Sequence, residues 1–317
     1  MRGRDARDTF EPPWWCMSNA GYKYFEPDKT GKFANLSLTA RQAVEGFISG
    51  LHRSPHRGFS VEFSEHREYT PGDDLRHLDW VAYGRTDRFY IKQYEQETNL
   101  RAYILLDVSG SMNYRLQAPL TKFQYGCFLS ACLAYLMTRQ QDTVGLAAFD
   151  QKIRLHLPPA SSPAHLDRLF KGLEGLSCGK TTAIAETFHQ MAQRIAKRGL
   201  IIIISDLYDE PDEVLRGLQH FCYQKHQLIL FHVLDPAELD FPFKKVTNFV
   251  DLETGQKIQA DPRLLRDSYR SEVGAFIERY RKECSDRRIE YVVCPTDQPY
   301  DIMLLNYLAR RKRLVRR

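Results

Sequence analysis

Four short, almost uninterrupted apolar runs restrict the fold of this chain more than any other feature. The runs are YILLD (103–107), TVGLAAF (143–149), LIIIISD (200–206) and HQLILFHVL (226–234). Segments of helical length, with apolar residues at spacings of three and four, lie between them at residues 122–140, 163–176, 182–198 and 211–226. Such runs are typical of strands buried on both faces, and their alternation with helices predicts an α/β fold with a doubly wound, mostly parallel sheet.

Other segments extend this fold. The run TVGLAAF followed by QKIRLHLP predicts a hairpin, which places one antiparallel strand at an edge of the sheet. KVTNFVDLETGQKIQA predicts a second hairpin that turns at Thr254 and Gly255. A long charged helix at about 262–287, a strand at IEYVVC and a final helix complete the expected order.

The N-terminal third of the chain lacks this alternation of apolar runs and helical segments. Residues 1–35 mix aromatic, Pro, Gly and charged residues without a period, so we expect an irregular arm. Residues 36–98 contain one amphipathic helical pattern and two alternating strand patterns, which predict a smaller α+β element. We therefore expect the main domain at 99–310 and a basic tail at 311–317.

The 317 residues contain no apolar stretch near the ~20 residues that cross a bilayer, and the N-terminus lacks the apolar run of a signal peptide. The seven cysteines include no CxxC pair, which fits reduced thiols. From these features we expect a cytoplasmic protein without membrane insertion.

The net charge of +5 is small, but RRKRLVRR at residues 310–317 is strongly basic. It could contact nucleic acid or an acidic partner. Acidic residues interrupt the other arginine-rich segment, 263–288, so nucleic-acid binding is the least favoured class of function. A solvated helix end, whose cations suit the helix dipole, explains the tail more simply.

Oxygen-bearing side chains follow two of the apolar strands. Asp107, Ser109 and Ser111 come directly after the first run, and Asp206 ends LIIIISD. Thr181 or Thr182, in CGKTT, precedes a helix. Because ligands of open α/β sheets bind beyond the carboxyl ends of the strands, we expect these residues to meet there. Hydroxyl and carboxylate oxygens suit a hard cation such as Mg²⁺.

This D-x-S-x-S loop, with the later threonine and the strand-end Asp, resembles the metal-ion-dependent adhesion site of von Willebrand factor A domains, whose sheet is of Rossmann type. The resemblance implies that Asp107, Ser109, Ser111, Thr181 and Asp206 hold Mg²⁺ or Mn²⁺. Lys180 stands where the commoner pattern has a second glycine, which leaves the choice between Thr181 and Thr182 open.

A second resemblance covers PGDDLRHLDWVAYGRTDRFYIKQYEQE, residues 71–97. This segment is similar to the signature of the bacterial and archaeal proteins called domain of unknown function 58. The matching residues are Gly72, Asp73, Asp74, Arg76, Asp79, Trp80 and Arg85. We expect the charged residues to form a structural cluster, with Trp80 in the core. Since members of this family are commonly encoded beside MoxR-type AAA+ ATPases, the resemblance implies such an ATPase as partner.

These features favour a non-enzymatic protein-interaction module, an adaptor or co-chaperone that docks a partner's Asp or Glu on a bound divalent ion. The alternative is a metal-dependent hydrolase or phosphoryl-transfer enzyme. GLSCGKT at 175–181 is one residue short of a P-loop and follows a helical segment rather than a strand. We therefore expect no enzymatic activity.

Overall fold

The computed structural model describes residues 61–70, 78–96, 100–179 and 183–315, and the chain divides into two compact units. The smaller unit ends immediately before Leu100, and the larger unit contains the described residues that follow. The bounds of the four segments expected from the sequence stay predictions.

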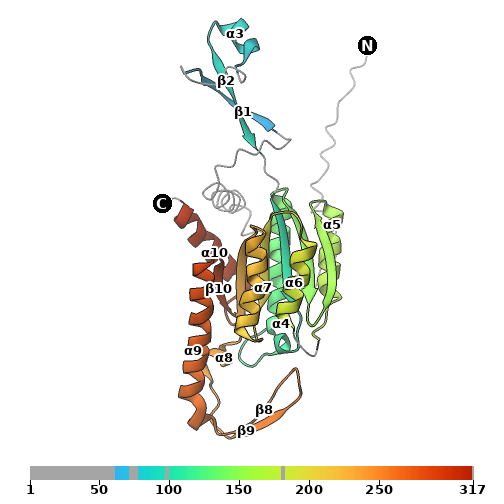
Figure 1. Cartoon of the computed structure of the whole chain (residues 1–317), viewed down its shortest axis with the longest axis vertical. Coiled ribbons are helices and arrows are strands. Elements are labelled where there is room, and N and C mark those ends of the chain that lie inside the picture. The colour runs from blue at the N-terminus through green and yellow to red at the C-terminus, as the bar shows by residue number, and fades with distance from the viewer. Residues whose placement is uncertain (1–60, 71–77, 97–99, 180–182, 316–317) are drawn as a thin grey trace, which may run out of the picture. The chain divides into compact units, whose positions relative to one another are not determined.

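The larger unit is built on a six-stranded sheet, in the part of the chain that the structure describes (Figure 1). Its strands are β3 (Arg101–Asp107), β4 (Thr143–Phe149), β5 (Ile153–Ala160), β6 (Leu200–Ser205), β7 (Gln227–Leu234) and β10 (Glu290–Pro295). They lie in the order β10-β7-β6-β3-β4-β5, and every neighbouring pair is parallel except β4 and β5. The predicted α/β fold with a mostly parallel sheet is confirmed.

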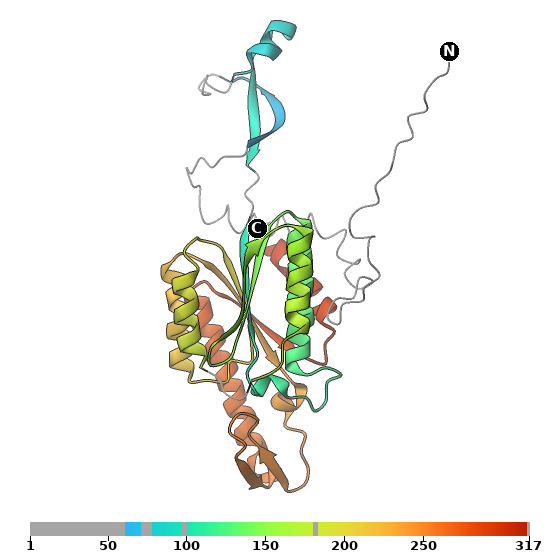
Figure 2. The same cartoon turned by 90° about the vertical axis from the view of Figure 1, so that its right-hand side faces the viewer.

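Helices cover both faces of this sheet, as Figure 2 shows from its edge. One face packs against α4 (Lys122–Arg139), α5 (Pro163–Glu174) and α10 (Tyr300–Val315). The other face packs against α6 (Ile184–Arg194), α7 (Pro211–Tyr223) and α9 (Pro262–Asp286). A short helix, α8 (Pro236–Asp240), follows β7.

The apolar runs form buried strands because both of their faces are covered. In β3, Ile104 and Leu106 belong to one core cluster, while Tyr103 and Leu105 belong to the other. This division follows from the alternation of side chains along a strand. Each fully buried Leu or Ile contributes about 1.5–3 kcal/mol of transfer free energy, so uninterrupted apolar runs stabilise a sheet that is covered on both sides.

The strand order places two carboxyl ends side by side at the point where the winding reverses. From β3 the chain passes through α4 to β4 on one side, and from β6 it passes through α7 to β7 on the other. Leu106 of β3 pairs with Ile204 of β6, so Asp107 and Ser205 end neighbouring strands. Such switch points are where open α/β sheets form a crevice for ligands.

Both predicted hairpins form. β5 pairs antiparallel with β4 at the edge of the sheet and carries Pro158 and Pro159 near its end. β8 (Thr247–Val250) and β9 (Lys257–Ala260) form the second hairpin, in which Gly255 takes a φ of +73°. Glycine is the residue best suited to this backbone conformation.

The smaller unit contains a two-stranded antiparallel sheet of β1 (Val61–Glu68) and β2 (Tyr90–Gln96), with α3 (Trp80–Thr86) between them in sequence. The carboxylate of Asp79 accepts a 3.1 Å hydrogen bond from the amide of Ala82 in the first turn of α3.

The prediction that Trp80 lies in the core is wrong. Its side chain is 66% exposed, and its ring packs edge-on against Tyr83 at 6.3 Å. The helical pattern from residue 38, the arm at 1–35 and the signature residues Gly72, Asp73, Asp74 and Arg76 lie outside the described residues.

Within the described part of the chain, no helix combines the length and the apolar character that crossing a bilayer requires.

Candidate functional site

Asp107 ends β3 with a completely buried side chain. Its Oδ1 accepts a 2.9 Å hydrogen bond from the amide of Ser109, and its Oδ2 accepts a 2.6 Å hydrogen bond from the hydroxyl of Ser205. The Ser205 hydroxyl in turn accepts from the amide of Leu207, at 2.9 Å. The carboxylate is therefore held by two loops that leave adjacent strands.

The two serines of the first loop meet. Ser109 is completely buried and Ser111, which begins the 3-10 turn η4 (Ser111–Asn113), is half-buried. Their hydroxyl oxygens lie 3.0 Å apart. Two ligands about 2.1 Å from an octahedral Mg²⁺, at a right angle, are separated by about 3.0 Å, so this spacing fits such an ion.

The third predicted loop approaches the first. The amide of Gly179 donates a 2.6 Å hydrogen bond to the carbonyl of Val108. A Cβ at Gly179 would lie 2.2 Å from a carboxylate oxygen of Asp150, so only glycine fits there without a shift. Lys180, Thr181 and Thr182 lie outside the described residues, and the assignment of a threonine ligand stays a prediction.

Asp206 has a cationic partner that the sequence did not indicate. Its Oδ2 lies 2.7 Å from Nζ of Lys122, the first residue of α4, and Nζ is also 2.7 Å from Oε1 of Glu238 in α8. Lys122 is completely buried. Burial lowers the pKa of Lys122, but the two carboxylates outweigh it and raise the pKa to about 12, so the ammonium stays charged.

The electrostatics of Asp107 differ from those of Asp206. Burial and then the charge of Asp206 raise the pKa of Asp107 to about 7, against the lowering effect of the hydrogen bonds from Ser205 and Ser109. No cationic side chain of the described residues pairs with Asp107. The charged form of this carboxylate would therefore gain from a cation at the strand ends.

His232 of β7 supports Asp206 from the other side. Its Nε2 lies 2.9 Å from the backbone carbonyl of Asp206, and its Nδ1 lies 2.5 Å from the hydroxyl of Tyr291. Burial lowers the pKa of His232 to about 4, so the ring is neutral near pH 7 and Nε2 donates to the carbonyl.

The structure thus brings Asp107, Ser109 and Ser111 together and places Asp206 directly after the adjoining strand β6, where it bonds to Lys122. No three His, Cys, Asp or Glu side chains gather as metal ligands would among the described residues. A metal at this place would depend on serine hydroxyls and few carboxylates. That donor set fits Mg²⁺ or Mn²⁺, which accept oxygen ligands and keep several waters.

Sequence reasoning missed Ser205, Lys122 and Glu238. Ser205 could have been recognised from the sequence, because it is the one hydroxyl residue in the apolar run of β6 and directly precedes Asp206. No sequence pattern distinguishes Lys122 from the other lysines of the chain. A lysine at the start of a predicted helix is normally expected on the surface.

Comparison with known proteins gives relatives of unassigned role. The family described as "Protein of unknown function DUF58" matches residues 65–277. Uncharacterized proteins of Mycobacterium bovis and Mycobacterium tuberculosis are 23% identical to this chain over 295 residues, which cover 91% of the chain and 91% of each relative.

Three solved structures resemble the chain. The conserved hypothetical protein BatB from Bacteroides thetaiotaomicron shares 17% identity, with a TM-score of 0.46, over 68% of this chain and 99% of that one. An aerotolerance-related membrane protein from Bacteroides fragilis shares 17% identity, with a TM-score of 0.45, over 67% of this chain and 99% of that one. An uncharacterized membrane spanning protein from Vibrio fischeri shares 14% identity, with a TM-score of 0.25, over 66% of this chain and 97% of that one.

The cytoplasmic location expected from the sequence is corrected by this comparison, because two of these three structures are named as membrane proteins. The expectation relied on the lack of an apolar spanning run and on the cysteines. Those features bear on insertion into a bilayer and on redox state, and neither determines where a protein lies.

Proposed function

The chain belongs to the DUF58 family, and we propose that it is a non-enzymatic protein-interaction module that docks an acidic side chain of a partner on a bound Mg²⁺ or Mn²⁺. We further propose that the larger unit is a von Willebrand factor A-like domain of Rossmann type with a metal-ion-dependent adhesion site. The proposed partner is a MoxR-type AAA+ ATPase, for which the chain acts as adaptor or co-chaperone.

The observation that carries the proposal is the meeting of Asp107, Ser109 and Ser111 at the switch point of the sheet. The hydroxyl oxygens of the two serines are 3.0 Å apart, which suits adjacent ligand positions of an octahedral ion, as argued above. Ser205 and the amide of Ser109 hold the Asp107 carboxylate in place.

The distribution of charge favours docking of an outside acid. Lys122 already offsets the charge of Asp206, and the serine hydroxyls are neutral. A divalent ion there would supply an incompletely neutralised positive centre to which a carboxylate of another protein can bind. Ser111, half-buried, marks the side of the cluster that faces solvent.

Titration of the purified chain, residues 1–317, with Mn²⁺, followed through the paramagnetic resonance of free Mn²⁺, tests the metal part. We expect one site per chain, weakened at least about tenfold by Asp107→Asn or Ser109→Ala because a charge or a ligand oxygen is lost. The exposed Asp267, in α9, provides the control variant Asp267→Asn, which should bind as the unmodified chain does. Equal binding by all four proteins contradicts the metal site.

Binding of a purified MoxR-type ATPase to the immobilised chain tests the docking part. The complex should form with Mg²⁺ and be lost with a chelator or with Asp107→Asn, and Asp267→Asn should leave it intact. An ATPase that binds equally with and without metal overturns the docking mechanism even where the metal site exists.

A further inference from the structure

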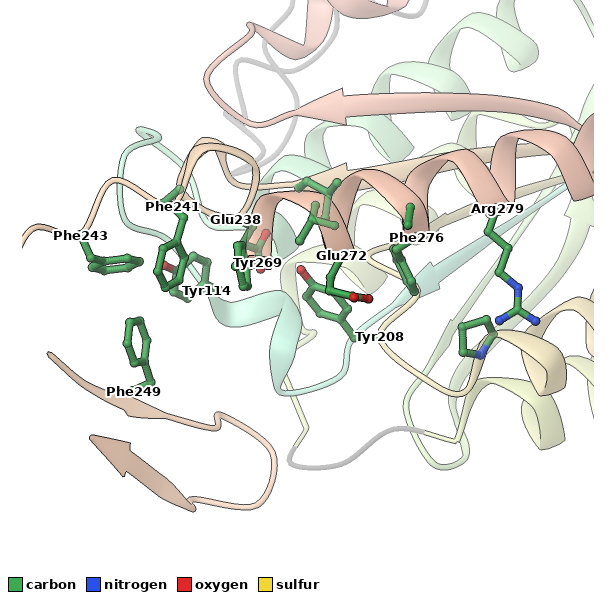
Figure 3. Close-up of a pocket in the computed structure, with 15 residues that line it drawn as sticks. Tyr114, Tyr208, Glu238, Phe241, Phe243, Phe249, Tyr269, Glu272, Phe276 and Arg279 are labelled. Carbon is green, nitrogen blue, oxygen red and sulfur yellow. The ribbon is translucent and has the colours of Figure 1, made fainter. Parts of the chain in front are cut away.

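A cavity of about 740 Å³ lies beside the strand ends, and seven of its fifteen lining residues are aromatic (Figure 3). Three tyrosines reach it from separate elements: Tyr114 follows η4, Tyr208 follows β6, and Tyr269 belongs to α9. A volume in this range suits a small molecule or a few residues of a peptide. We name this cavity the aromatic pocket.

Four phenylalanines complete its wall: Phe241, Phe243, Phe249 and Phe276. The ring of Phe241 stacks on Tyr269 with centroids 4.3 Å apart and on Phe249 with centroids 5.6 Å apart. Phe243 packs edge-on against both Phe241 and Phe249. Because the rings hold one another, the wall is formed before any ligand arrives, which reduces the entropic cost of binding.

The charged groups that line the aromatic pocket are two carboxylates and one guanidinium. Its charged lining residues are Glu238, Glu272 and Arg279, and the ion-pair partners of these residues are Lys122 for Glu238 and Asp212 for Arg279. Arg266 of α9 also lies at the wall, where its guanidinium donates a 2.6 Å hydrogen bond to the carbonyl of Phe243. Glu238 and Arg279 are thus paired, and the carboxylate of Glu272 disfavours an anion beside it.

Glu272 is the acid that this network leaves open. It projects from α9 in the middle of the aromatic pocket (Figure 3), its side chain is exposed, and it makes no ion pair with another residue of the described ranges. A cation bound in this pocket could contact the carboxylate of Glu272 and the face of an aromatic ring at the same time.

The rings already hold one cation from the inner side. Nζ of Lys122 lies 4.7 Å from the centroid of Tyr208 and 5.8 Å from that of Tyr114. Ring faces carry negative electrostatic potential, and they attract ammonium and guanidinium groups at such distances. Asp206 and Glu238 offset the charge of Lys122, so it does not repel a second cation.

We propose that the aromatic pocket binds a lysine or arginine side chain of a partner protein, with the aliphatic part of that side chain against the phenylalanines and its charged end beside Glu272. The open carboxylate of Glu272 and the ring faces together favour this ligand over an acidic or a purely apolar one. The proposal does not depend on the metal site, so it is tested in the presence of a chelator.

The test uses the whole chain of residues 1–317 and four pentapeptides, Gly-Gly-X-Gly-Gly, in which X is Lys, Arg, norleucine or Glu. Dissociation constants come from ligand-observed saturation-transfer NMR with protein protons irradiated. We expect the Lys and Arg peptides to bind at least about fivefold more tightly than the norleucine peptide, and the Glu peptide to bind most weakly. Norleucine that binds as tightly as lysine overturns the cation site in favour of an apolar one.

Two variants locate the site. Glu272→Gln should weaken the Lys peptide about fivefold and leave the norleucine peptide unchanged, because only the charge is lost. Glu278→Gln, on the same helix but outside the lining, is the matched control and should leave both unchanged. An unchanged lysine preference in Glu272→Gln, or no binding of any peptide at about 5 mM, contradicts the proposal.

Discussion

The ammonium nitrogen of Lys122 lies 2.7 Å from Oδ2 of Asp206, and the two side chains are almost entirely excluded from solvent. With Glu238, also 2.7 Å from Nζ, Lys122 ties the start of α4 to the end of β6 and to α8. Buried charges persist only when they are paired, so each member of this cluster requires the others. Within this cluster Asp206 is a predicted metal ligand, and Glu238 lines the aromatic pocket.

Lys122→Met removes the one cation of this cluster. We expect the free energy of unfolding to fall by about 3–5 kcal/mol, because two buried carboxylates lose their partner. Urea denaturation followed by circular dichroism measures this change. In the triple variant that adds Asp206→Asn and Glu238→Gln, much of the loss should be recovered.

Lys171→Met is the control for that prediction. Lys171 is 68% exposed and pairs with Asp167 at 2.9 Å on the surface of α5. Its loss should cost less than about 1 kcal/mol. Equal effects of the two lysine variants would mean that Lys122 is not buried with its acids.

Ser205→Ala removes the hydroxyl that donates to Asp107 and accepts from the amide of Leu207. Since both partners are buried and lose a bond, stability should fall by about 1–3 kcal/mol. Ser130→Ala provides a matched control in α4, because that buried hydroxyl donates to the carbonyl of Gly126 within the helix. Guanidinium denaturation of both variants at pH 8 should show the larger loss for Ser205→Ala.

Gly179→Ala introduces a Cβ 2.2 Å from the carboxylate of Asp150. Relief of this overlap requires movement of the loop or of the Asp150–Arg154 ion pair, which should cost about 1–3 kcal/mol. Gly274→Ala, in α9, meets no atom within 4 Å and should stabilise the helix by about 0.5–1 kcal/mol. Opposite shifts of the thermal midpoint in calorimetry are the expected outcome, and a neutral Gly179→Ala would contradict the close approach.

His226 should make stability fall with acid. Its Nδ1 accepts a 3.1 Å hydrogen bond from the amide of Gly199, and burial lowers the pKa of the folded-state imidazole below its ordinary value of 6.5. The unfolded chain therefore binds the proton first as the pH drops below about 6.5, and stability is lost from there toward the lowered pKa. The slope from this residue is at most about 1.4 kcal/mol per pH unit.

His226→Asn keeps an acceptor for Gly199 but cannot titrate. Denaturation at pH 7.5 and at pH 5.5 should show a smaller loss of stability for this variant than for the unmodified chain. A loss of equal size in both proteins would assign the acid sensitivity to other groups.

The strands and helices were readable from the sequence because their signals are local. LIIIISD has the pattern typical of a strand covered on both faces, and the spacing of Asp107, Ser109 and Ser111 places all three within one loop. Ser205 and Lys122 depend instead on contacts across 98 and 84 residues, with Asp107 and Asp206 respectively. The periodicity of apolar residues along the sequence gives no information on contacts between residues so far apart in the chain.

Two other features, the exposure of Trp80 and the aromatic pocket, could not be predicted from sequence patterns. Trp80 was expected inside because large aromatic residues are usually well buried, yet the short helix that it begins leaves its ring mostly exposed. The rings of Phe241, Phe243 and Tyr269 gather through an irregular segment and a helix. The conformation of an irregular segment is set by tertiary packing and carries no period.

The prolines of β5 have a consequence for assembly. Pro158 and Pro159 carry no amide hydrogen, so the outer margin of the sheet presents an interrupted row of donors there. A neighbouring chain that tried to add itself as a further strand would find no continuous ladder to extend, which guards this margin against open-ended polymerisation.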